Sequence, residues 1–352
     1  MTFLKKFYLK EVYMRIGVLT GGGDCPGLNS TIRSIYYKSR KYGYEVFGFF
    51  EGWKGVIENS GRLIELSDVE EIENLGGTIL FSSRTNPFKE EKGVEKILDT
   101  LNKNKIDALI AIGGDDTLSV AAKLYEEYKV KVVGVPKTMD NDVYGTDYTF
   151  GFDSATTISM DALEKLKDTA KAMKRIIILE VMGREAGWVA LFTGLAGCAD
   201  ITLIPEEGLD EDEFIKKVSK VFTEKEYAVI CVSEGVEIVE KEGVEVDAFG
   251  HKLLQEKGVG NFIGKLIKDK LGINTRVAQI GHIQRGGPPT LFDRILTIRL
   301  GVKAVEMVKE KEFGKMATLI NGKIDSIPLK DVLGKTKNVD SYWIDLKSVF
   351  EP

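Results

Sequence analysis

The sequence contains few residues of the kinds that build disulfide frameworks or metal clusters. Three cysteines, Cys25, Cys198 and Cys231, are spread over 352 residues without a Cys-x-x-Cys pair. A disulfide framework or a zinc site is therefore disfavoured, and we expect a reducing compartment, the cytoplasm. Two histidines, His251 and His282, are too few for a multi-histidine metal site.

Long apolar runs and an excess of positive charge are also missing. No hydrophobic stretch reaches the ~18 residues that a membrane-spanning helix needs, and the charged segment 1–10 is not followed by the cleavage site of a signal peptide. The formal net charge is -5, from 49 basic and 54 acidic side chains. We therefore expect neither a membrane nor a nucleic acid as partner, and an anionic ligand must be held by a local cluster of Arg, Lys and backbone N–H groups.

Short β-rich runs alternate with longer amphipathic stretches along most of the chain. This alternation predicts parallel sheets covered by helices on both faces, and 352 residues favour two domains. We expect an α/β fold with two doubly wound, Rossmann-like parallel-sheet domains and the active site in the cleft between them. The predicted strands are 14–20, 44–50, 106–112, 130–135, 175–181, 200–204, 228–233 and 275–280. The predicted helices are 28–41, one ending near 128, 154–173, 186–197, 211–223, 250–271 and 293–310.

A glycine-rich loop, 20–27, follows the first predicted strand. Its glycines, Gly22 and Gly23 among them, let backbone N–H groups approach an anion, and the next helix adds partial positive charge. The loop lacks the Gly-Lys-[Ser/Thr] ending of a P-loop, and Pro26 replaces the last glycine of Gly-x-Gly-x-x-Gly. A tight βα turn without a ligand is the alternative.

Two other strand-end loops carry carboxylates. Loop 113–117 has two adjacent aspartates, whose repulsion Mg²⁺ would offset; a helix N-cap is the alternative. In loop 136–142, Lys137 and Thr138 can hold a phosphate and an aspartate can act as general base, whereas an Asx-rich turn is the structural alternative.

Two more strand-end loops are cationic. Loop 180–187 carries Arg184, and loop 281–287 carries His282 and Arg285. Arginine is suited to bidentate contacts with phosphate. The alternative, for each residue taken alone, is that the arginine forms a surface ion pair and that His282 is a structural hydrogen-bond donor. The carboxyl ends of parallel strands meet at one edge, and acidic and cationic loops gathered there favour phosphoryl transfer between phosphorylated small molecules.

Five blocks of these loops, in this order and spacing, resemble the phosphofructokinase family. The similarity runs from about Arg15 almost to the C-terminus, so that 1–12 is an N-terminal extension without a counterpart. It implies a phosphoryl-donor domain, 13–150 plus about 290–330, a fructose 6-phosphate domain, 151–289, and a C-terminal segment, 331–352. The blocks are Gly22-Gly23-Asp24 with Pro26-Gly27, Gly113-Gly114-Asp115, Thr138-Met139-Asp140-Asn141-Asp142, Met182-Gly183-Arg184 and Gly281-His282-Ile283-Gln284-Arg285-Gly286-Gly287.

The resemblance implies a role for each matching residue. Asp140 would accept the proton of the sugar 1-hydroxyl with support from Thr138 and Asp142, Asp115 would bind Mg²⁺, and Arg184 would stabilise the transferred phosphoryl group. Arg175 and Arg276 match positions that reach the sugar 6-phosphate from a neighbouring subunit, which implies a homodimer or homotetramer with shared sites. The residues that would hold fructose 6-phosphate within one chain are Thr138, Met139, Asp140, Met182, Gly183, Arg184, Glu234, His282, Ile283, Gln284 and Arg285.

Two positions bear on the phosphoryl donor. ATP-using relatives typically carry glycine where this chain has Asp116 and Lys137. A carboxylate at 116 fills the space of a nucleotide α-phosphate and repels it, whereas pyrophosphate ends at its second phosphoryl and Lys137 can neutralise the leaving phosphate. Two charges ~4 Å apart interact by about 4 kcal/mol at an effective dielectric of roughly 20. We therefore expect pyrophosphate as donor, held also by Gly22, Gly23 and Arg84.

The expected reaction converts pyrophosphate and fructose 6-phosphate into phosphate and fructose 1,6-bisphosphate, reversibly. The nearest alternative is an ATP-dependent 6-phosphofructokinase. A dinucleotide-binding oxidoreductase is disfavoured by Pro26 and by Phe49-Phe50 at the end of the second strand, and a non-catalytic binding subunit by the intact Asp115, Asp140 and Arg184.

The sequence also departs from the pattern that holds an activating nucleotide in bacterial ATP-dependent relatives. Two glutamates stand in 223–227, and Tyr37 replaces an arginine beside the retained Arg33 and Arg62. We expect no strong allosteric control by ADP or phosphoenolpyruvate.

Overall fold

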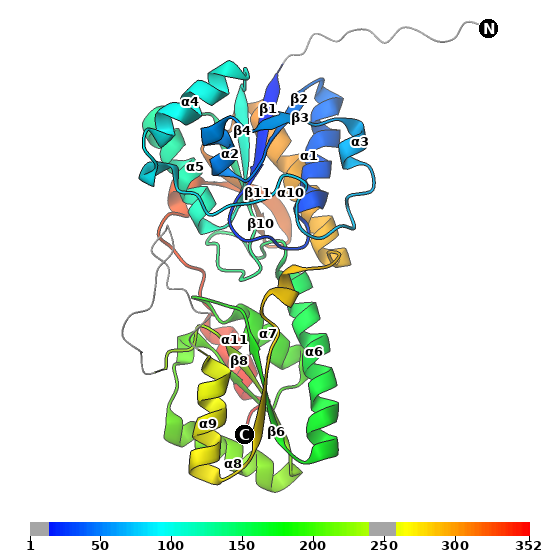
Figure 1. The fold of residues 1–352 in the computed structure, drawn as a ribbon, viewed down its shortest axis with the longest axis vertical. Coiled ribbons are helices and arrows are strands. Elements are labelled where there is room, and N and C mark those ends of the chain that lie inside the picture. The colour runs from blue at the N-terminus through cyan, green and yellow to red at the C-terminus, as the bar shows by residue number, and fades with distance from the viewer. Residues whose placement is uncertain (1–13, 239–257) are drawn as a thin grey trace, which may run out of the picture.

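The computed structural model describes residues 14–238 and 258–352, which form two α/β bodies stacked end to end (Figure 1). Each body has a central sheet covered by helices on both faces. The predicted extension 1–12, His251 and the first residues of the predicted helix 250–271 lie outside the described residues. In the part of the chain that is described, no helix combines the length and apolar character needed to cross a membrane.

The upper body in Figure 1 contains a seven-stranded sheet in the order β11-β10-β5-β4-β1-β2-β3. Five neighbouring strands are parallel, and the edge strands β3 and β11 are antiparallel. Because both faces are covered, a central strand such as β4 is apolar throughout. The strands are β1 (Arg15–Thr20), β2 (Glu45–Phe49), β3 (Gly61–Leu63), β4 (Ala108–Gly113), β5 (Val132–Pro136), β10 (Lys315–Ile320) and β11 (Lys323–Pro328).

Helices α1 and α10 pack on one face of this sheet, and α2, α4 and α5 pack on the other. Gly27 and Gly43 bound α1 with φ of 108° and 78°, a left-handed backbone that glycine adopts without strain. The start of α1 is therefore fixed directly after the glycine-rich loop. The helices are α1 (Leu28–Tyr42), α2 (Trp53–Glu58), the short α3 (Leu66–Val69), α4 (Gly93–Lys103), α5 (Asp115–Tyr128) and α10 (Leu291–Glu310).

The lower body contains a four-stranded parallel sheet in the order β7-β8-β6-β9. Helices α6 and α7 cover one face, and α8 and α9 cover the other. The strands are β6 (Ile176–Val181), β7 (Ile201–Leu203), β8 (Ala228–Ser233) and β9 (Thr275–Gln279). The helices are α6 (Phe152–Met173), α7 (Trp188–Gly197), α8 (Glu211–Lys225) and α9 (Val259–Leu271).

The C-terminal part of the chain visits both bodies. After α10, strands β10 and β11 extend the upper sheet beside β5, and the chain then returns to the lower body (Figure 1). There α11 (Ser341–Ser348) packs Trp343 against Trp188 and Phe192. The division into 13–150 plus about 290–330, 151–289 and 331–352 stays a prediction.

The α/β class and its parallel sheets are confirmed, and the predicted strands and helices begin and end within two residues of the observed ones, apart from the start of the predicted helix 250–271. There α9 begins at Val259, because Gly258 has a left-handed φ of 56° that ends the helix on its N-terminal side. The predicted elements do not include α2, α3, α4, α11, β3, β10 or β11. Two of these, β3 and β11, are the antiparallel edges, which carry polar residues and lack the continuous apolar character of a central strand.

Candidate active site

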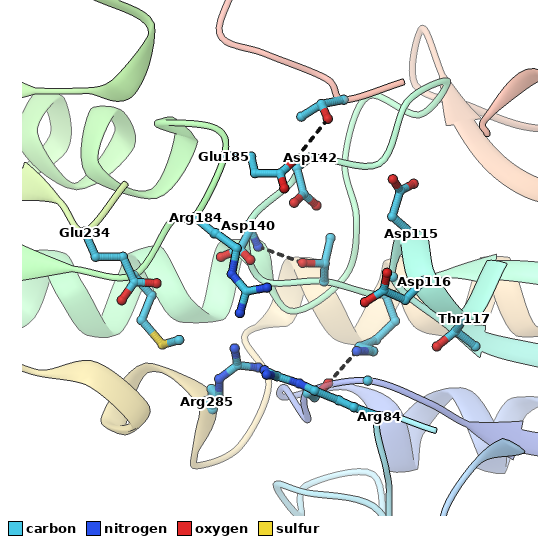
Figure 2. Close-up of a pocket in the computed structure, with 17 residues that line it drawn as sticks. Arg84, Asp115, Asp116, Thr117, Asp140, Asp142, Arg184, Glu185, Glu234 and Arg285 are labelled. Carbon is cyan, nitrogen blue, oxygen red and sulfur yellow. Dashed lines mark hydrogen bonds between the residues drawn. The ribbon is translucent and has the colours of Figure 1, made fainter. Parts of the chain in front are cut away.

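A polar pocket lies where the two bodies meet (Figure 2). Most of its lining residues belong to the segments that follow β1, β4, β5, β6, β8 and β9 at their carboxyl ends, and Arg84 and Thr336 come from other loops. This is the edge at which ligands bind in open parallel sheets. The lining residues are Gly22, Gly23, Arg84, Gly114, Asp115, Asp116, Thr117, Lys137, Thr138, Asp140, Asp142, Met182, Arg184, Glu185, Glu234, Arg285 and Thr336.

The glycine-rich loop touches the lower body through Arg285. A guanidinium N–H of Arg285 donates to the Asp24 carbonyl at 3.0 Å. A Cβ built on Gly23 would lie 2.1 Å from Arg285 Nη1, so only glycine leaves room for this contact. The loop therefore holds a cation from the opposite body against its backbone.

Asp115 and Asp116 occupy the first turn of α5, and the N-cap is Gly114. Carboxylates in this turn complement the positive end of the helix, and both residues also line the pocket. The capping interpretation is thus correct only in part, because neither aspartate is the N-cap and both face ligand space.

The loop after β5 is fixed by Asn141, which is buried and has a left-handed φ of 54°. Its Oδ1 accepts the Thr149 N–H at 3.0 Å, while the Thr149 hydroxyl donates to the Thr138 carbonyl at 2.7 Å. Thr138 in turn accepts the Asp140 N–H on its hydroxyl oxygen at 3.1 Å. These bonds satisfy the turn from within and leave the side chains of Asp140 and Asp142 to the pocket.

The carboxyls of this loop are protonated more readily than usual. Burial raises the pKa of Asp140, and nearby Arg285 and Arg184 act against that rise. Burial, and after it the negative charges of Asp140 and Asp115, raise the pKa of Asp142 to about 8. Asp140 Oδ1 accepts no hydrogen bond from the described residues, so a buried acceptor is open toward the pocket.

Lys137 is buried, with 3% of its surface exposed. Its ammonium donates to the Gly23 carbonyl, which joins the β5 loop to the glycine-rich loop. Burial lowers the pKa of Lys137. The ammonium therefore lies at the pocket floor beside the glycine loop, out of bulk water.

Arg184 and Glu234 reach the pocket from the lower body. Figure 2 shows Arg184 and Arg285 extending toward the same central space, with Asp140 and Glu234 near them. The turn before Arg184 is held by a bond from the Ser233 hydroxyl to the Gly183 carbonyl at 2.7 Å. Burial raises the pKa of Glu234 to about 7, and the negative charge of Asp140 adds to the rise.

Several residues singled out from the sequence do not line this pocket. The Met139 side chain is buried in the core of the upper body. Gln284 is also buried and bonds the Ser159 hydroxyl at 2.8 Å. His282 and Ile283 are exposed, Ile283 by 66%.

Arg175 and Arg276 lie together at the opposite end of the lower sheet. They line one hollow, with Met173 and Lys174, at the amino ends of β6 and β9. Within a single chain they are thus remote from the pocket that contains Asp140.

Three lining residues, Thr117, Glu185 and Thr336, have no role in the sequence analysis. Thr117 lies in loop 113–117, of which only the aspartates are given roles. Glu185 adjoins Arg184 in loop 180–187, which the sequence analysis assigns to the site. Its neighbourhood to Arg184 is therefore a signal that could have identified Glu185 as a lining residue. Thr336 lies in 331–352, nearly 200 residues beyond Asp142, and reaches the pocket only because the chain returns there. No local pattern marks it.

The lining contains six carboxyls and four cationic side chains, so the pocket alone is poorly matched to phosphate anions. A divalent cation would correct this balance, and the oxygen groups present are ligands that Mg²⁺ accepts, completed by phosphate and water. Across residues 14–238 and 258–352, no group of three or more His, Cys, Asp or Glu forms a ready-made metal cage.

The family model for phosphofructokinase matches residues 15–308. The chain is 45% identical to pyrophosphate--fructose 6-phosphate 1-phosphotransferase of Dictyoglomus thermophilum, over 96% of this chain and 99% of that relative. It is 48% identical to the protein of the same name from Amycolatopsis methanolica and 42% identical to ATP-dependent 6-phosphofructokinase of Corynebacterium efficiens, with the same coverage in both cases.

Solved structures have the same fold. The crystal structure of pyrophosphate-dependent phosphofructokinase from Nitrosospira multiformis matches 93% of this chain and 86% of that chain with a TM-score of 0.82, at 21% identity. On the match over residues 15–308 and these near-full-length relatives, the chain belongs to the phosphofructokinase family.

Proposed function

We propose that the protein transfers a phosphoryl group from pyrophosphate to O1 of fructose 6-phosphate, giving phosphate and fructose 1,6-bisphosphate. Relatives of similar identity have names with either donor, so identity alone does not choose between pyrophosphate and ATP. The observation that carries the proposal is that Asp116 and the buried Lys137 line the same pocket.

These two side chains favour a short donor. The carboxylate of Asp116, in the first turn of α5, would meet and repel the part of a nucleotide that continues beyond its second phosphoryl. The Lys137 ammonium, held on the Gly23 carbonyl, offsets charge on a departing inorganic phosphate. A buried cation is more effective than an exposed one because water screens it less.

Asp140 is the proposed general base. Its buried, unfilled acceptor oxygen suits a hydroxyl donor, and its raised pKa brings it closer to the operating pH of a base. Arg184 and Arg285 would balance the negative charge of the transferred group from the sugar side. The backbone N–H groups at Gly22 and Gly23 would orient pyrophosphate for in-line attack.

Asp115 is the proposed contact for Mg²⁺, which would neutralise pyrophosphate oxygens when bound. The remaining sugar contacts, Met182, Gly183 and Glu234 in this chain and Arg175 and Arg276 across a subunit boundary, are proposed on the family resemblance. The hollow shared by the two arginines lies far from the pocket of its own chain. It therefore suits a role in a neighbouring site.

The proposal includes weak or absent nucleotide control. Arg33 pairs with Glu73 at 3.3 Å, and Arg62 pairs with Asp68 at 2.6 Å. Both arginines are thus already matched with carboxylates of the same chain. A sigmoidal fructose 6-phosphate curve straightened by ADP would contradict this part of the proposal.

The decisive experiment measures initial rates with pyrophosphate, ATP and other nucleoside triphosphates, with Mg²⁺ and fructose 6-phosphate held constant. The mass of the sample in solution is determined in parallel. We expect turnover with pyrophosphate and at most a few per cent of that rate with nucleotides. Comparable turnover with ATP in the absence of pyrophosphate would reject the donor assignment.

A further inference from the structure

A short segment of the C-terminal chain, residues 335–339, runs from the upper to the lower body and borders the active-site pocket at Thr336. We call it the strap. It lies between β11 of the upper body and α11 of the lower body in the chain (Figure 1). Thr336 within it lines the pocket. Its polar groups bond loops of both bodies.

The strap binds the loop of the proposed base through Lys337. The Lys337 N–H donates to the Asp142 carbonyl at 2.8 Å. Its ammonium donates to the carbonyls of Asp147 at 2.8 Å and Thr146 at 3.0 Å. A bridge between Thr336 and Val143 adds to this attachment.

The same segment binds the loop that carries Arg184. The Thr336 hydroxyl donates to Glu185 at 3.2 Å, the dashed line at Glu185 in Figure 2. The Trp188 indole N–H donates to the Lys337 carbonyl at 2.7 Å, and the Lys337 ammonium lies 5.2 Å from the centre of that ring.

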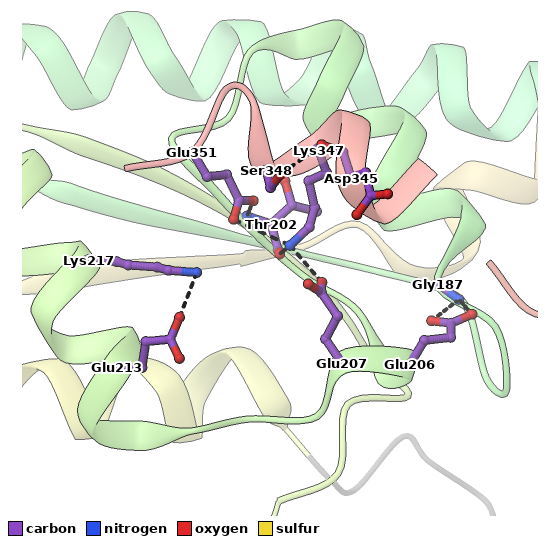
Figure 3. Close-up of polar contacts among 10 residues, drawn as sticks. All are labelled: Gly187, Thr202, Glu206, Glu207, Glu213, Lys217, Asp345, Lys347, Ser348 and Glu351. Carbon is purple, nitrogen blue, oxygen red and sulfur yellow. Dashed lines mark hydrogen bonds and ion pairs between the residues drawn. The ribbon is translucent and has the colours of Figure 1, made fainter. Parts of the chain in front are cut away.

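Glu206 completes this connection. Its carboxylate accepts the Val339 N–H at 2.9 Å and the Gly187 N–H at 3.0 and 3.1 Å; the latter pair is drawn in Figure 3. Gly187 begins α7, so one carboxylate joins the strap to the helix directly after the Arg184 loop.

The two joined loops belong to different sheets, so no strand pairing sets their separation. Phosphoryl transfer needs the base and the cationic loop at a fixed spacing, since a displacement of about 1 Å costs as much as 100-fold in rate. Lys337 is the residue of the strap whose backbone and side chain together contact both loops.

We propose that Lys337 is a positioning residue, which holds the Asp140–Asp142 loop at a fixed distance from the Arg184 loop. Lys337 does not line the pocket and acts through its neighbours. This inference rests on the proposed phosphoryl transfer but not on which donor is used.

The test compares Lys337→Met, which keeps the chain length and the backbone bonds, with Lys337→Arg, which keeps a cation able to donate to two carbonyls. Lys335→Met is the matched control, because Lys335 is an exposed strap lysine stacked on Tyr144. For Lys337→Met we expect kcat to fall about tenfold with KM for both substrates within about twofold. Lys337→Arg should recover most of the loss, and Lys335→Met should match the natural protein.

Folding and function are separated by recording thermal unfolding of every variant and scaling rates to folded protein. A change in KM alone, a loss of kcat in proportion to lost folded protein, or no recovery by arginine would overturn the proposal. If Lys337→Met does not fold, Lys337→Gln is the substitute variant, because its neutral side-chain amide keeps a donor for one of the two carbonyls that the ammonium contacts. Its kcat should fall about threefold, and an unchanged kcat would be contrary evidence.

The donor assignment is judged separately, on the natural protein. If that protein turns over ATP in place of pyrophosphate, the donor proposal fails, and the same variants are compared with ATP. Their kcat ratios then still decide whether the strap positions the loops.

Discussion

At the scale of single residues, the donor preference depends on Asp116 and Lys137. We predict that Asp116→Gly with Lys137→Gly gains turnover with ATP and loses at least tenfold with pyrophosphate, because the repulsion at the α-phosphate and the cation for the leaving phosphate both disappear. Initial rates with the two donors measure this. The single changes are the controls, and a double variant that still uses pyrophosphate alone would show that other residues set the preference.

The buried carboxyl of Glu234 leads to a prediction about how the free energy of unfolding depends on pH. Burial raises its pKa to about 7 in the folded protein, whereas an unfolded chain has about 4.3. Between these values the folded state holds the additional proton, so the contribution of Glu234 to folding stability is full below about pH 4 and declines as the pH rises to 7. Glu234→Gln should therefore remove part of the fall in unfolding free energy between pH 5 and 8, measured by urea denaturation.

The control for that experiment is Glu237→Gln. Glu237 is exposed and, like Glu234, lies just after β8. It should reproduce the pH dependence of the natural protein. If Glu234→Gln also reproduces it, the pKa of Glu234 is not raised by burial.

Residue-scale features of the site could be predicted because they are local. Gly22, Gly23, Asp115, Lys137, Asp140 and Arg184 lie in loops whose composition is unusual for a surface turn, and all line one pocket. The directions of Met139 and Gln284 could not be predicted, since a side chain beside a catalytic neighbour points either to the ligand or to the core. Only packing against the rest of the fold decides between them.

At the scale of elements, α11 protects an open sheet edge (Figure 3). Lys347, only 5% exposed, contacts Glu207 at 2.6 Å and donates to the Thr202 carbonyl of β7 at 3.1 Å. Glu351 accepts the Thr202 N–H at 2.7 Å. Both backbone groups of the middle residue in an edge strand are thus occupied, which prevents pairing with another chain.

We predict that Lys347→Met lowers the free energy of unfolding by about 2–3 kcal/mol, because it leaves buried acceptors unpaired. The estimate stays below that of a fully buried pair, since Glu207 is about one-third exposed. Lys217→Met is the matched control on the same body, because Lys217 pairs with Glu213 at 3.2 Å on the surface. That pair should be worth about 0.5 kcal/mol or less. Equal losses in urea denaturation would contradict the assignment.

The helices and strands differ in how well local sequence patterns predict them. β1, β4 and β8 are short apolar runs bounded by glycine or polar residues, and α1 has glycine at both ends. In α4, apolar residues recur at Val94, Ile97, Leu98 and Leu101, so a helical signal exists there. β11 has a largely polar sequence and becomes a strand by pairing with β10. Local sequence patterns do not predict such a pairing.

At the scale of the whole molecule, the placement of Arg175 and Arg276 allows a test of shared sites. We predict that Arg276→Ser and Asp140→Asn are each nearly inactive alone but regain activity when mixed and reassembled. In a dimer with random exchange, half of the molecules would be hybrids with one intact site each, so about a quarter of the natural activity should return. Mass in solution verifies the exchange.

No recovery in verified hybrids would place both residues in one subunit's site and contradict the family-based assignment. Asp161→Asn, mixed with Arg276→Ser, is the control. Asp161 is an exposed residue of α6 paired with Lys165, so this variant should be active by itself.

The order in which the chain builds its two sheets has a consequence for synthesis on the ribosome. β6 to β9 are consecutive, whereas the upper sheet needs β10 and β11 from beyond residue 314. Until these emerge, the backbone edge of β5 has no neighbour on that side. Helix α1 likewise lacks the cover of α10 until residues 291–310 have emerged, shortly before β10. N-terminal segments usually fold first. Here the upper body cannot complete its sheet until β10 and β11 have been synthesised, so we expect chaperones to bind the nascent chain most during that interval.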